Sequence, residues 1–224
     1  MVAGVNAASA PSMRALGARL AGSVAVVAMA LLGPSDAARA QDPASDEPAR
    51  LMNDLMTGKT PVGGPFTLRD TAGRQRSLAE FRGKVVLLVF GYTGCPDVCP
   101  AELAEVARLL DTQDADGTRL QAIFITLDPE RDTAAILRDY VAAFHPRLLA
   151  LRGSAEETRA LARAYKVAYR RVAQPGSAVA LVDHSAFIYV LDRAGKFVAF
   201  FPPGTEAGRM AVMLRELGVD AAQR

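Results

Sequence analysis

The chain has 224 residues, half of them hydrophobic, with 26 basic against 24 acidic side chains and a formal net charge of +2. The first 40 residues hold three arginines and one aspartate, so the remaining 184 residues balance 23 basic against 23 acidic side chains. That balance argues against a nucleic acid or a strongly charged protein as the partner. A length of 184 residues suits one domain with a sizeable hydrophobic core.

The N-terminus has the pattern of an export signal. Arg14 and Arg19 flank the start of an uncharged apolar run over residues 20–32, and a small-x-small cleavage site follows at residues 38–40. The run is shorter than the roughly 20 residues that a membrane span needs. We therefore expect residues 1–40 to be a cleaved signal peptide, with an uncleaved N-terminal anchor as the alternative. Export would place the domain in an oxidising compartment, where a disulfide can persist.

Residues 41–60 are rich in Asp, Glu, Pro and small residues, and we expect them to form a linker. Met52 and Met56 lie four residues apart within it. A short helix packed on the domain, or a tail, explains them more simply than auxiliary thioether ligands for a soft metal do. The domain itself is expected over residues 61–224.

The domain is predicted to begin with a β-hairpin at residues 66–68 and 75–77, followed by a short turn that a Ser77–Glu80 capping box starts. Residues 84–90 then read as a strand. Their unbroken apolar run indicates burial on both faces of a mostly parallel sheet.

The only two cysteines, Cys95 and Cys99, come directly after this strand and directly before a helical pattern. In that helix Leu103, Val106, Ala107 and Leu110 share one face, with Glu102 and Glu105 expected on other faces.

The remaining pattern alternates strands and helices. A second buried strand is expected at residues 120–127, then a turn at 128–133, and then a helix ended by Pro146 with Ile136, Leu137, Tyr140, Val141 and Phe144 inward. Next come a short strand at residues 149–151, a helix opened by a Ser154–Glu157 capping box, a β-prone stretch at 166–172 and a loop at 174–178. The chain ends with a hairpin, formed by residues 187–191 and 196–201, and a last helix that buries Met210, Met213, Leu214 and Leu217.

This order of elements predicts an α/β sandwich with a mixed central sheet. Cysteines at the first strand-to-helix junction make it the thioredoxin arrangement. The start of a helix stabilises a thiolate, so sulfur chemistry is expected there. Three residues separate the cysteines, where redox thioredoxins have two. Such a loop can close a disulfide, or it can hold both sulfurs around a soft ion such as Cu(I) or Zn, with a third ligand from elsewhere.

Histidine is scarce in this chain. His145 lies at a helix end before Pro146, where it is a poor candidate for a ligand. His184 stands just before the predicted strand at 187–191, at a junction that faces the cysteines in a thioredoxin-like fold. His184 is therefore the expected third ligand.

The motif at residues 91–100, together with Asp128-Pro129-Glu130-Arg131-Asp132-Thr133 and Asp183-His184-Ser185, resembles the Sco/SenC family over nearly the whole of the domain. The resemblance implies a thioredoxin-like, usually membrane-tethered protein that binds copper through Cys95, Cys99 and His184 and serves assembly of the binuclear copper centre of cytochrome c oxidase. Asp183 would orient His184 from beside the site, or simply be a turn residue. Asp128 is expected to be a cap or turn carboxylate rather than a metal ligand.

Two positions depart from the pattern. Gly94 stands where many relatives carry a larger side chain. Ala186 stands where redox thioredoxins carry a cis-proline that supports substrate binding, which favours metal binding over general disulfide exchange.

Three functions follow as hypotheses. The first is a periplasmic copper metallochaperone for Cu(I), or for Cu(II) if a further oxygen or nitrogen donor joins, delivering to the oxidase subunit that carries the binuclear centre. The second is a thiol-disulfide reductase that uses Cys95 and Cys99, and the third is a domain with a structural disulfide. Further expected partners are periplasmic copper carriers or thiol reductases, with membrane association only through an uncleaved N-terminus. Whether the protein is an enzyme depends on the second hypothesis.

Overall fold

The computed structural model describes residues 59–173 and 180–219, all of which lie within one compact unit of the chain, Pro43–Arg224. The predicted signal or anchor and most of the predicted linker, with Met52 and Met56, fall outside the described residues. Inside them, no helix has both the length and the hydrophobicity that crossing a membrane would take.

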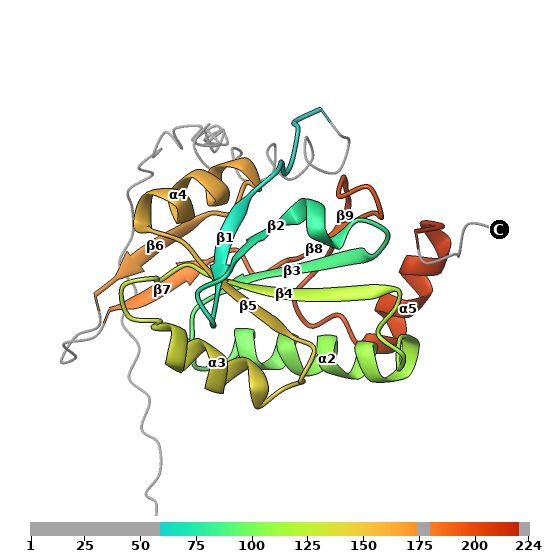
Figure 1. The fold of residues 1–224 in the computed structure, drawn as a ribbon, viewed down its shortest axis with the longest axis horizontal. Coiled ribbons are helices and arrows are strands. Elements are labelled where there is room, and N and C mark those ends of the chain that lie inside the picture. The colour runs from blue at the N-terminus through green and yellow to red at the C-terminus, as the bar shows by residue number, and fades with distance from the viewer. Residues whose placement is uncertain (1–58, 174–179, 220–224) are drawn as a thin grey trace, which may run out of the picture. The chain divides into compact units, whose positions relative to one another are not determined.

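A seven-stranded mixed sheet forms the centre of this unit, in the order β2-β1-β5-β4-β3-β8-β9 (Figure 1). Its strands are β1 (Thr67–Asp70), β2 (Gln75–Ser77), β3 (Val85–Gly91), β4 (Leu120–Thr126), β5 (Leu149–Arg152), β8 (Ile188–Leu191) and β9 (Phe197–Phe201). The pairs β3–β4 and β4–β5 are parallel and the other four are antiparallel. The predicted N-terminal hairpin and mixed central sheet are confirmed.

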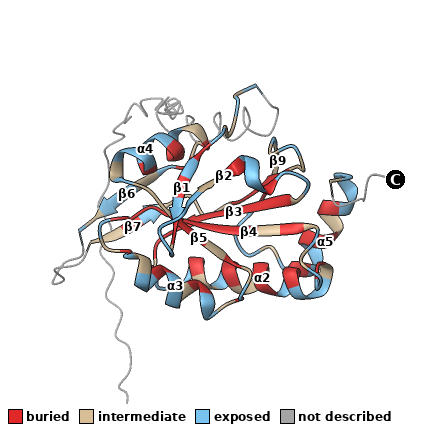
Figure 2. Ribbon diagram, in the orientation of Figure 1, coloured by how far each residue is buried: buried red, intermediate tan, exposed pale blue. Residues whose placement is uncertain are grey.

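Helices cover both faces of the sheet. They are α2 (Val98–Gln113), α3 (Ala134–Ala142), α4 (Ala155–Ala164), α5 (Ala207–Glu216) and the short 3₁₀ helix η2 (Leu78–Phe81). Alternate residues of β3 enter two different cores: Val85, Leu87 and Val89 pack with residues of α2, α3 and α5, and the residues between them pack with residues of α4 and η2. Every residue of β3 is therefore buried, as Figure 2 shows, which explains its unbroken apolar run.

Three side-chain placements differ from the predictions. Ile136 is 46% exposed because α3 has only nine residues and turns Leu137 and Val141, four residues apart, toward the sheet. Leu217 is 41% exposed because α5 ends at Glu216, before that residue can complete the buried face. Glu102, expected on a face other than the one that Leu103 and Leu110 share, is buried on α2.

A second sheet, of two strands, is separate from the seven-stranded sheet. It consists of β6 (Tyr169–Val172) and β7 (Leu181–His184), which pair antiparallel with Tyr169 opposite His184. β7 was not predicted, since only Leu181 and Val182 in it are apolar. His184 is thus the last residue of a strand rather than part of a turn before the next one. We call β6 and β7 the histidine hairpin.

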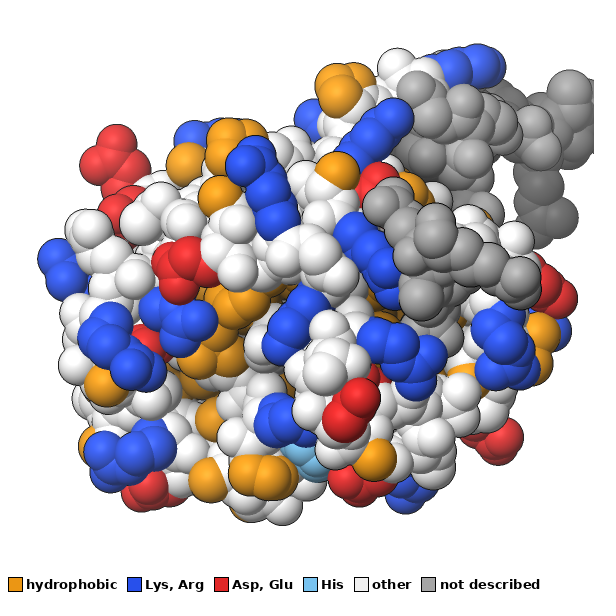
Figure 3. All heavy atoms as spheres, turned by 45° about the vertical axis from the view of Figure 1, so that its right-hand side comes forward, with side chains coloured by type: hydrophobic (Ala, Val, Ile, Leu, Met, Phe, Trp, Pro, Cys, Tyr) orange, Lys and Arg blue, Asp and Glu red, His pale blue; other side chains and the backbone are white. Residues whose placement is uncertain are grey.

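The surface carries charges of both signs. Figure 3 shows one face, on which basic side chains are dispersed among acidic and hydrophobic ones. Exposed ion pairs include Arg76–Glu80, Arg108–Glu105, Arg138–Asp139 and Arg170–Asp183. Pairs of this kind contribute little to stability individually, so we attribute the stability of the fold mainly to its two cores.

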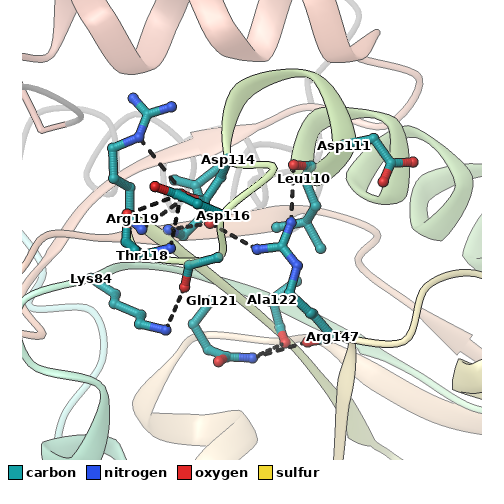
Figure 4. A network of polar contacts seen from close by, with 12 residues as sticks. Lys84, Leu110, Asp111, Asp114, Asp116, Thr118, Arg119, Gln121, Ala122 and Arg147 are labelled. Atoms are coloured by element: carbon teal, nitrogen blue, oxygen red, sulfur yellow. Dashed lines mark hydrogen bonds and ion pairs between the residues drawn. The ribbon is translucent and has the colours of Figure 1, made fainter.

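The far end of α2 is held by a buried carboxylate, Asp114 (Figure 4). Asp114 accepts hydrogen bonds from the backbone N–H groups of Arg119 (2.9 Å) and Leu120 (3.0 Å) and from the Arg147 guanidinium (2.9 Å). Burial alone would raise the pKa of Asp114, but these three donors together lower it. The network fixes the connection from α2 to β4, so that the opposite end of α2, where the cysteines lie, rests on an anchored helix.

Candidate metal centre

The two cysteines lie on either side of the N-terminus of α2. β3 ends at Gly91, and a loop of residues 92–97, which we call the cysteine loop, carries Cys95; Cys99 lies in the first turn of the helix. Asp97 takes the N-cap position, but its side chain makes no capping hydrogen bond. Instead the backbone N–H of Cys99 points to the Sγ atom of Cys95 at 3.4 Å. A sulfur therefore occupies the place that a side-chain oxygen normally takes at a helix start.

This placement gives the two thiols different pKa values. The hydrogen bond from the Cys99 side chain, opposed by burial and aided by His184 and the backbone, lowers the pKa of Cys95 to about 4. The same hydrogen bond between the two side chains, together with burial, raises the pKa of Cys99. The reduced pair thus holds one thiolate, on Cys95, and one thiol, on Cys99. Cys95 is 9% exposed and Cys99 is fully buried, so the thiolate is the sulfur nearer to solvent.

His184 reaches the same point from the histidine hairpin. Its Nε2 lies 3.3 Å from the Sγ of Cys99, and its Nδ1 lies 3.2 Å from the carbonyl oxygen of Ser185. A carbonyl oxygen only accepts, so Nδ1 carries a proton and Nε2 is the nitrogen turned toward sulfur. Burial alone would lower the pKa of His184, but the Cys95 thiolate, the Ser185 carbonyl and Glu102 raise it.

The structure therefore brings together the three predicted ligands, which the sequence separates by up to 89 positions. One ligand atom each from Cys95, Cys99 and His184 lies within 4.8 Å of the other two, and this is the one such group among the described residues. Two sulfurs and an imidazole nitrogen form a donor set that suits Cu(I) or Zn. A hollow of about 420 Å³ opens beside the group, lined in part by Tyr92, Pro96 and Val182.

Glu102 is a residue of this region that the sequence analysis missed. Its side chain is buried one helical turn after Cys99, and neither carboxylate oxygen has a hydrogen-bond partner. Burial, partly offset by His184, raises the pKa of Glu102 to about 7. Its i, i+3 spacing from Cys99 was the available signal, because that spacing places both side chains on the same side of a helix.

The remaining predicted residues lie around the group. Asp183 forms an exposed ion pair with Arg170, while the hydrogen bond from His184 goes to the backbone of Ser185, so a role for Asp183 in orienting His184 stays a prediction. Asp128 is fully buried and forms ion pairs with two arginines, Arg131 and Arg171.

The other histidine of the chain is engaged elsewhere. His145 lies 3.1 Å from Asp111 through Nε2 and accepts the backbone N–H of Arg147 at Nδ1, over 3.0 Å. Both of its nitrogens therefore have partners outside the metal group.

Comparison with known proteins gives a consistent picture. The family model described as SCO1/SenC matches residues 54–218. The mitochondrial SCO2 homolog of Bos taurus is 42% identical over 154 residues, which are 68% of this chain and 58% of that protein. The chain thus matches little more than half the length of that relative.

Two solved structures share the fold. The crystal structure of Arabidopsis thaliana ScoI with copper bound has a TM-score of 0.65 and 35% identity, covering 70% of this chain and 97% of that one. Bradyrhizobium japonicum ScoI with copper bound has a TM-score of 0.64 and 37% identity, covering 70% and 99%. The thioredoxin-like arrangement predicted from the order of elements is confirmed.

Proposed function

Because this chain belongs to the SCO1/SenC family, we propose that it binds copper through Cys95, Cys99 and His184 and passes the ion to a partner protein. The observation that carries the proposal is the convergence of these three ligand atoms within 4.8 Å from two separate segments of the fold. Copper-bound structures of similar proteins support the choice of copper among the soft metals.

Cu(I) is the ion that the donor set favours, because it is soft and accepts thiolates. Two thiolates and a neutral imidazole give a Cu(I) complex a net charge of −1, so loading requires the proton of Cys99 to leave. Any proton on Nε2 of His184 must leave as well. Cu(II) would need a further oxygen or nitrogen donor.

The site is suited to transfer as well as to binding. Cys95 borders the hollow of about 420 Å³, whereas Cys99 is buried behind it. A ligand of a partner can approach the ion from the side of Cys95 and His184 and replace them one at a time. We propose the subunit with the binuclear copper centre of cytochrome c oxidase as the recipient, and periplasmic copper carriers or thiol reductases as the suppliers of copper and electrons.

The proposed location is the periplasm, reached through the signal at residues 1–40 and either released by cleavage or tethered to the inner membrane. Cell fractionation of the tagged chain tests this location, because a cleaved form would leave the membrane on washing and a tethered form would stay with it.

Metal analysis with X-ray absorption on the reduced protein tests the copper site. We expect one Cu(I) with two sulfur ligands and one nitrogen ligand. Cys95→Ser with Cys99→Ser should abolish uptake. For delivery, cells lacking the chain should lose the binuclear copper centre of their oxidase, and wild-type but not Cys99→Ser protein should restore it.

A second function, thiol-disulfide reduction, is favoured by the ionised, partly accessible Cys95. Its thiolate would attack a partner disulfide and release one partner thiolate, forming a mixed disulfide. Cys99, once deprotonated, would then attack Cys95 Sγ and release the second partner thiolate, leaving a Cys95–Cys99 disulfide and moving two electrons to the partner. A thiolate with so low a pKa is a good leaving group but a weak nucleophile, so we place this activity second. Brisk reduction of a model disulfide that is insensitive to His184→Ala would reverse that order.

A further inference from the structure

The two segments that carry the ligands are not joined by sheet hydrogen bonds. The cysteine loop follows β3 of the seven-stranded sheet, and the histidine hairpin forms a separate sheet of two strands. The separation between His184 and the cysteines therefore depends on whatever holds the hairpin against the main body. The turn Asp128-Pro129-Glu130-Arg131-Asp132, which we call the 128–132 turn, makes hydrogen bonds to both segments.

Asp132 holds the cysteine loop. Its carboxylate accepts hydrogen bonds from the Thr93 backbone N–H (3.1 Å) and the Thr93 hydroxyl (2.6 Å). The hydroxyl of Thr126, at the end of β4, donates to the same carboxylate (2.5 Å) and accepts the N–H of Asp128 (3.0 Å). Asp132 is 2% exposed, so these bonds are shielded from water. The loop is thereby tied to the end of β4.

Asp128 and Arg131 hold the histidine hairpin. Arg171, on β6, donates to Asp128 over 2.8 Å and to Glu130 over 2.7 Å. Arg131 donates to the other oxygen of Asp128, and its Nη1 donates to the carbonyl oxygen of Ala180, one residue before β7, over 2.8 Å. The fully buried carboxylate of Asp128 thus holds β6 directly and the residue before β7 through Arg131.

A stack of side chains links the turn to the imidazole itself. The Arg131 guanidinium lies 6.0 Å from the centre of the Tyr92 ring, and that ring meets the ring of His184 edge-on at 6.2 Å. Tyr92 and Val182, in β7, also line the same hollow. Movement of Arg131 would therefore disturb its contact with Ala180 and, through the Tyr92 ring, the position of His184.

We propose that the 128–132 turn is the positioning element of the metal site: Asp132 fixes the cysteine loop, and Asp128 with Arg131 fixes the hairpin, so that together they set the distance from His184 Nε2 to the sulfurs. The proposal rests on the proposed copper function for its effect on affinity, but not for its effect on the metal-free protein. Residues that hold a metal ligand in place typically affect metal affinity by about 10–100-fold.

The test compares Arg131→Gln with Arg138→Gln, which removes an exposed arginine paired with Asp139 on α3. In the metal-free reduced protein, backbone amides of β6 and β7 should exchange hydrogen at least about tenfold faster in Arg131→Gln, with β3 and β4 unchanged. Arg171→Gln, which removes only the β6 contacts of a half-exposed side chain, should show the same effect if Arg131→Gln fails to fold.

With Cu(I), Arg131→Gln should lose the nitrogen ligand from the X-ray absorption spectrum, and its affinity should fall by about tenfold or more. The double variant with His184→Ala should bind no more weakly than His184→Ala alone, because both changes remove the same ligand. Hairpin exchange at the control rate in both arginine variants, or additive losses in the double variant, would overturn the proposal. If the wild type takes up no copper, the proposed function fails, and the exchange rates still decide the role of the turn.

Discussion

The backbone N–H of Cys99 lies 3.4 Å from the sulfur of Cys95, so the first cysteine caps the helix that carries the second. The three residues between them, Pro96, Asp97 and Val98, lead from this sulfur into the start of the helix. The contact also means that the same sulfur serves the fold and the metal. Changes at Cys95 should therefore alter stability as well as copper binding.

The imidazole is predicted to contribute one of three copper ligands. His184→Ala should weaken Cu(I) binding by about tenfold or more, because it removes the nitrogen ligand and leaves only the two sulfurs. Competition with a chelator of known Cu(I) affinity measures the change. His145→Ala is the matched control, since it removes the other histidine, which is engaged by Asp111 and Arg147. Equal affinity in wild type and His184→Ala would exclude the three-ligand site.

Ionisation of Cys95 should be visible in the metal-free protein. With a pKa of about 4, its thiolate absorbance should persist from neutral pH down to about pH 5 and disappear only below that. Cys99→Ala should shift the transition upward, because it removes the side chain that donates to this sulfur. The stability that the thiolate adds is present above the ordinary thiol pKa and is lost as the pH falls through the folded value. A transition near pH 8–9 in the wild type would contradict this assignment.

Copper affinity should rise with pH across the neutral range. Cys99 and His184 both have raised pKa values, and Cu(I) must displace a proton from each group that still holds one. The number of protons released, from calorimetry in buffers of different ionisation enthalpy, should be at least one per copper. A binding constant that is independent of pH between 6 and 9 would show that both groups are already deprotonated.

Glu102 should make the metal-free fold less stable as pH rises. Its pKa of about 7 lies above the ordinary value of 4.5, so the folded state favours the protonated acid. The resulting penalty grows as the pH rises from 4.5 through 7 and reaches about 3 kcal/mol above that range. Glu102→Gln should remove this pH dependence from urea unfolding curves, and Glu216→Gln, an exposed residue of α5, should not. Identical curves for wild type and Glu102→Gln would show that the carboxylate finds a partner.

Two glycines of the motif should respond differently to an added methyl group. At Gly91 a Cβ atom would lie 2.8 Å from the sulfur of Cys99 and 2.9 Å from the ring of Phe124, whereas at Gly94 its nearest neighbour is the Tyr92 ring at 3.4 Å. Gly91→Ala should cost about 1–3 kcal/mol of unfolding free energy and disturb the copper spectrum. Gly94→Ala should leave both within error. The result would agree with room for a larger side chain at Gly94 and none at Gly91.

Much of the fold was predictable because its signals are local. The run at 85–90 marks a strand buried on both faces, and the capping box of Ser154 with Glu157 marks the start of α4; the side-chain bond of Ser154 is present in the structure. Strand β7 was missed because its pairing with β6 comes from outside the segment. The short apolar pair Leu181-Val182 contains no information about that partner.

Some residues of the site were likewise predictable from the sequence and others were not. Cys95, Cys99 and His184 were identified from spacing and from the motif, and the structure brings them together. The i, i+3 spacing from Cys99 placed Glu102 on the cysteine side of the helix, but its lack of a hydrogen-bond partner and the bonds from Thr93 to Asp132 could not be predicted, because each depends on how distant segments pack. The sequence of a turn does not show whether its carboxylate faces water or accepts buried hydrogen bonds.

The separation of the histidine hairpin from the main sheet has a consequence for turnover of the protein. Cys99 and His184 are 85 positions apart, so an ion held between them closes a large loop of the chain, as a removable cross-link would. In the chain-entropy treatment, a covalent link over such a loop lowers the entropy of the unfolded state by an amount worth roughly 4–5 kcal/mol. A metal bond that opens on transfer would give up that constraint. The metal-free protein would then be opened by a protease more readily than the metal-loaded one.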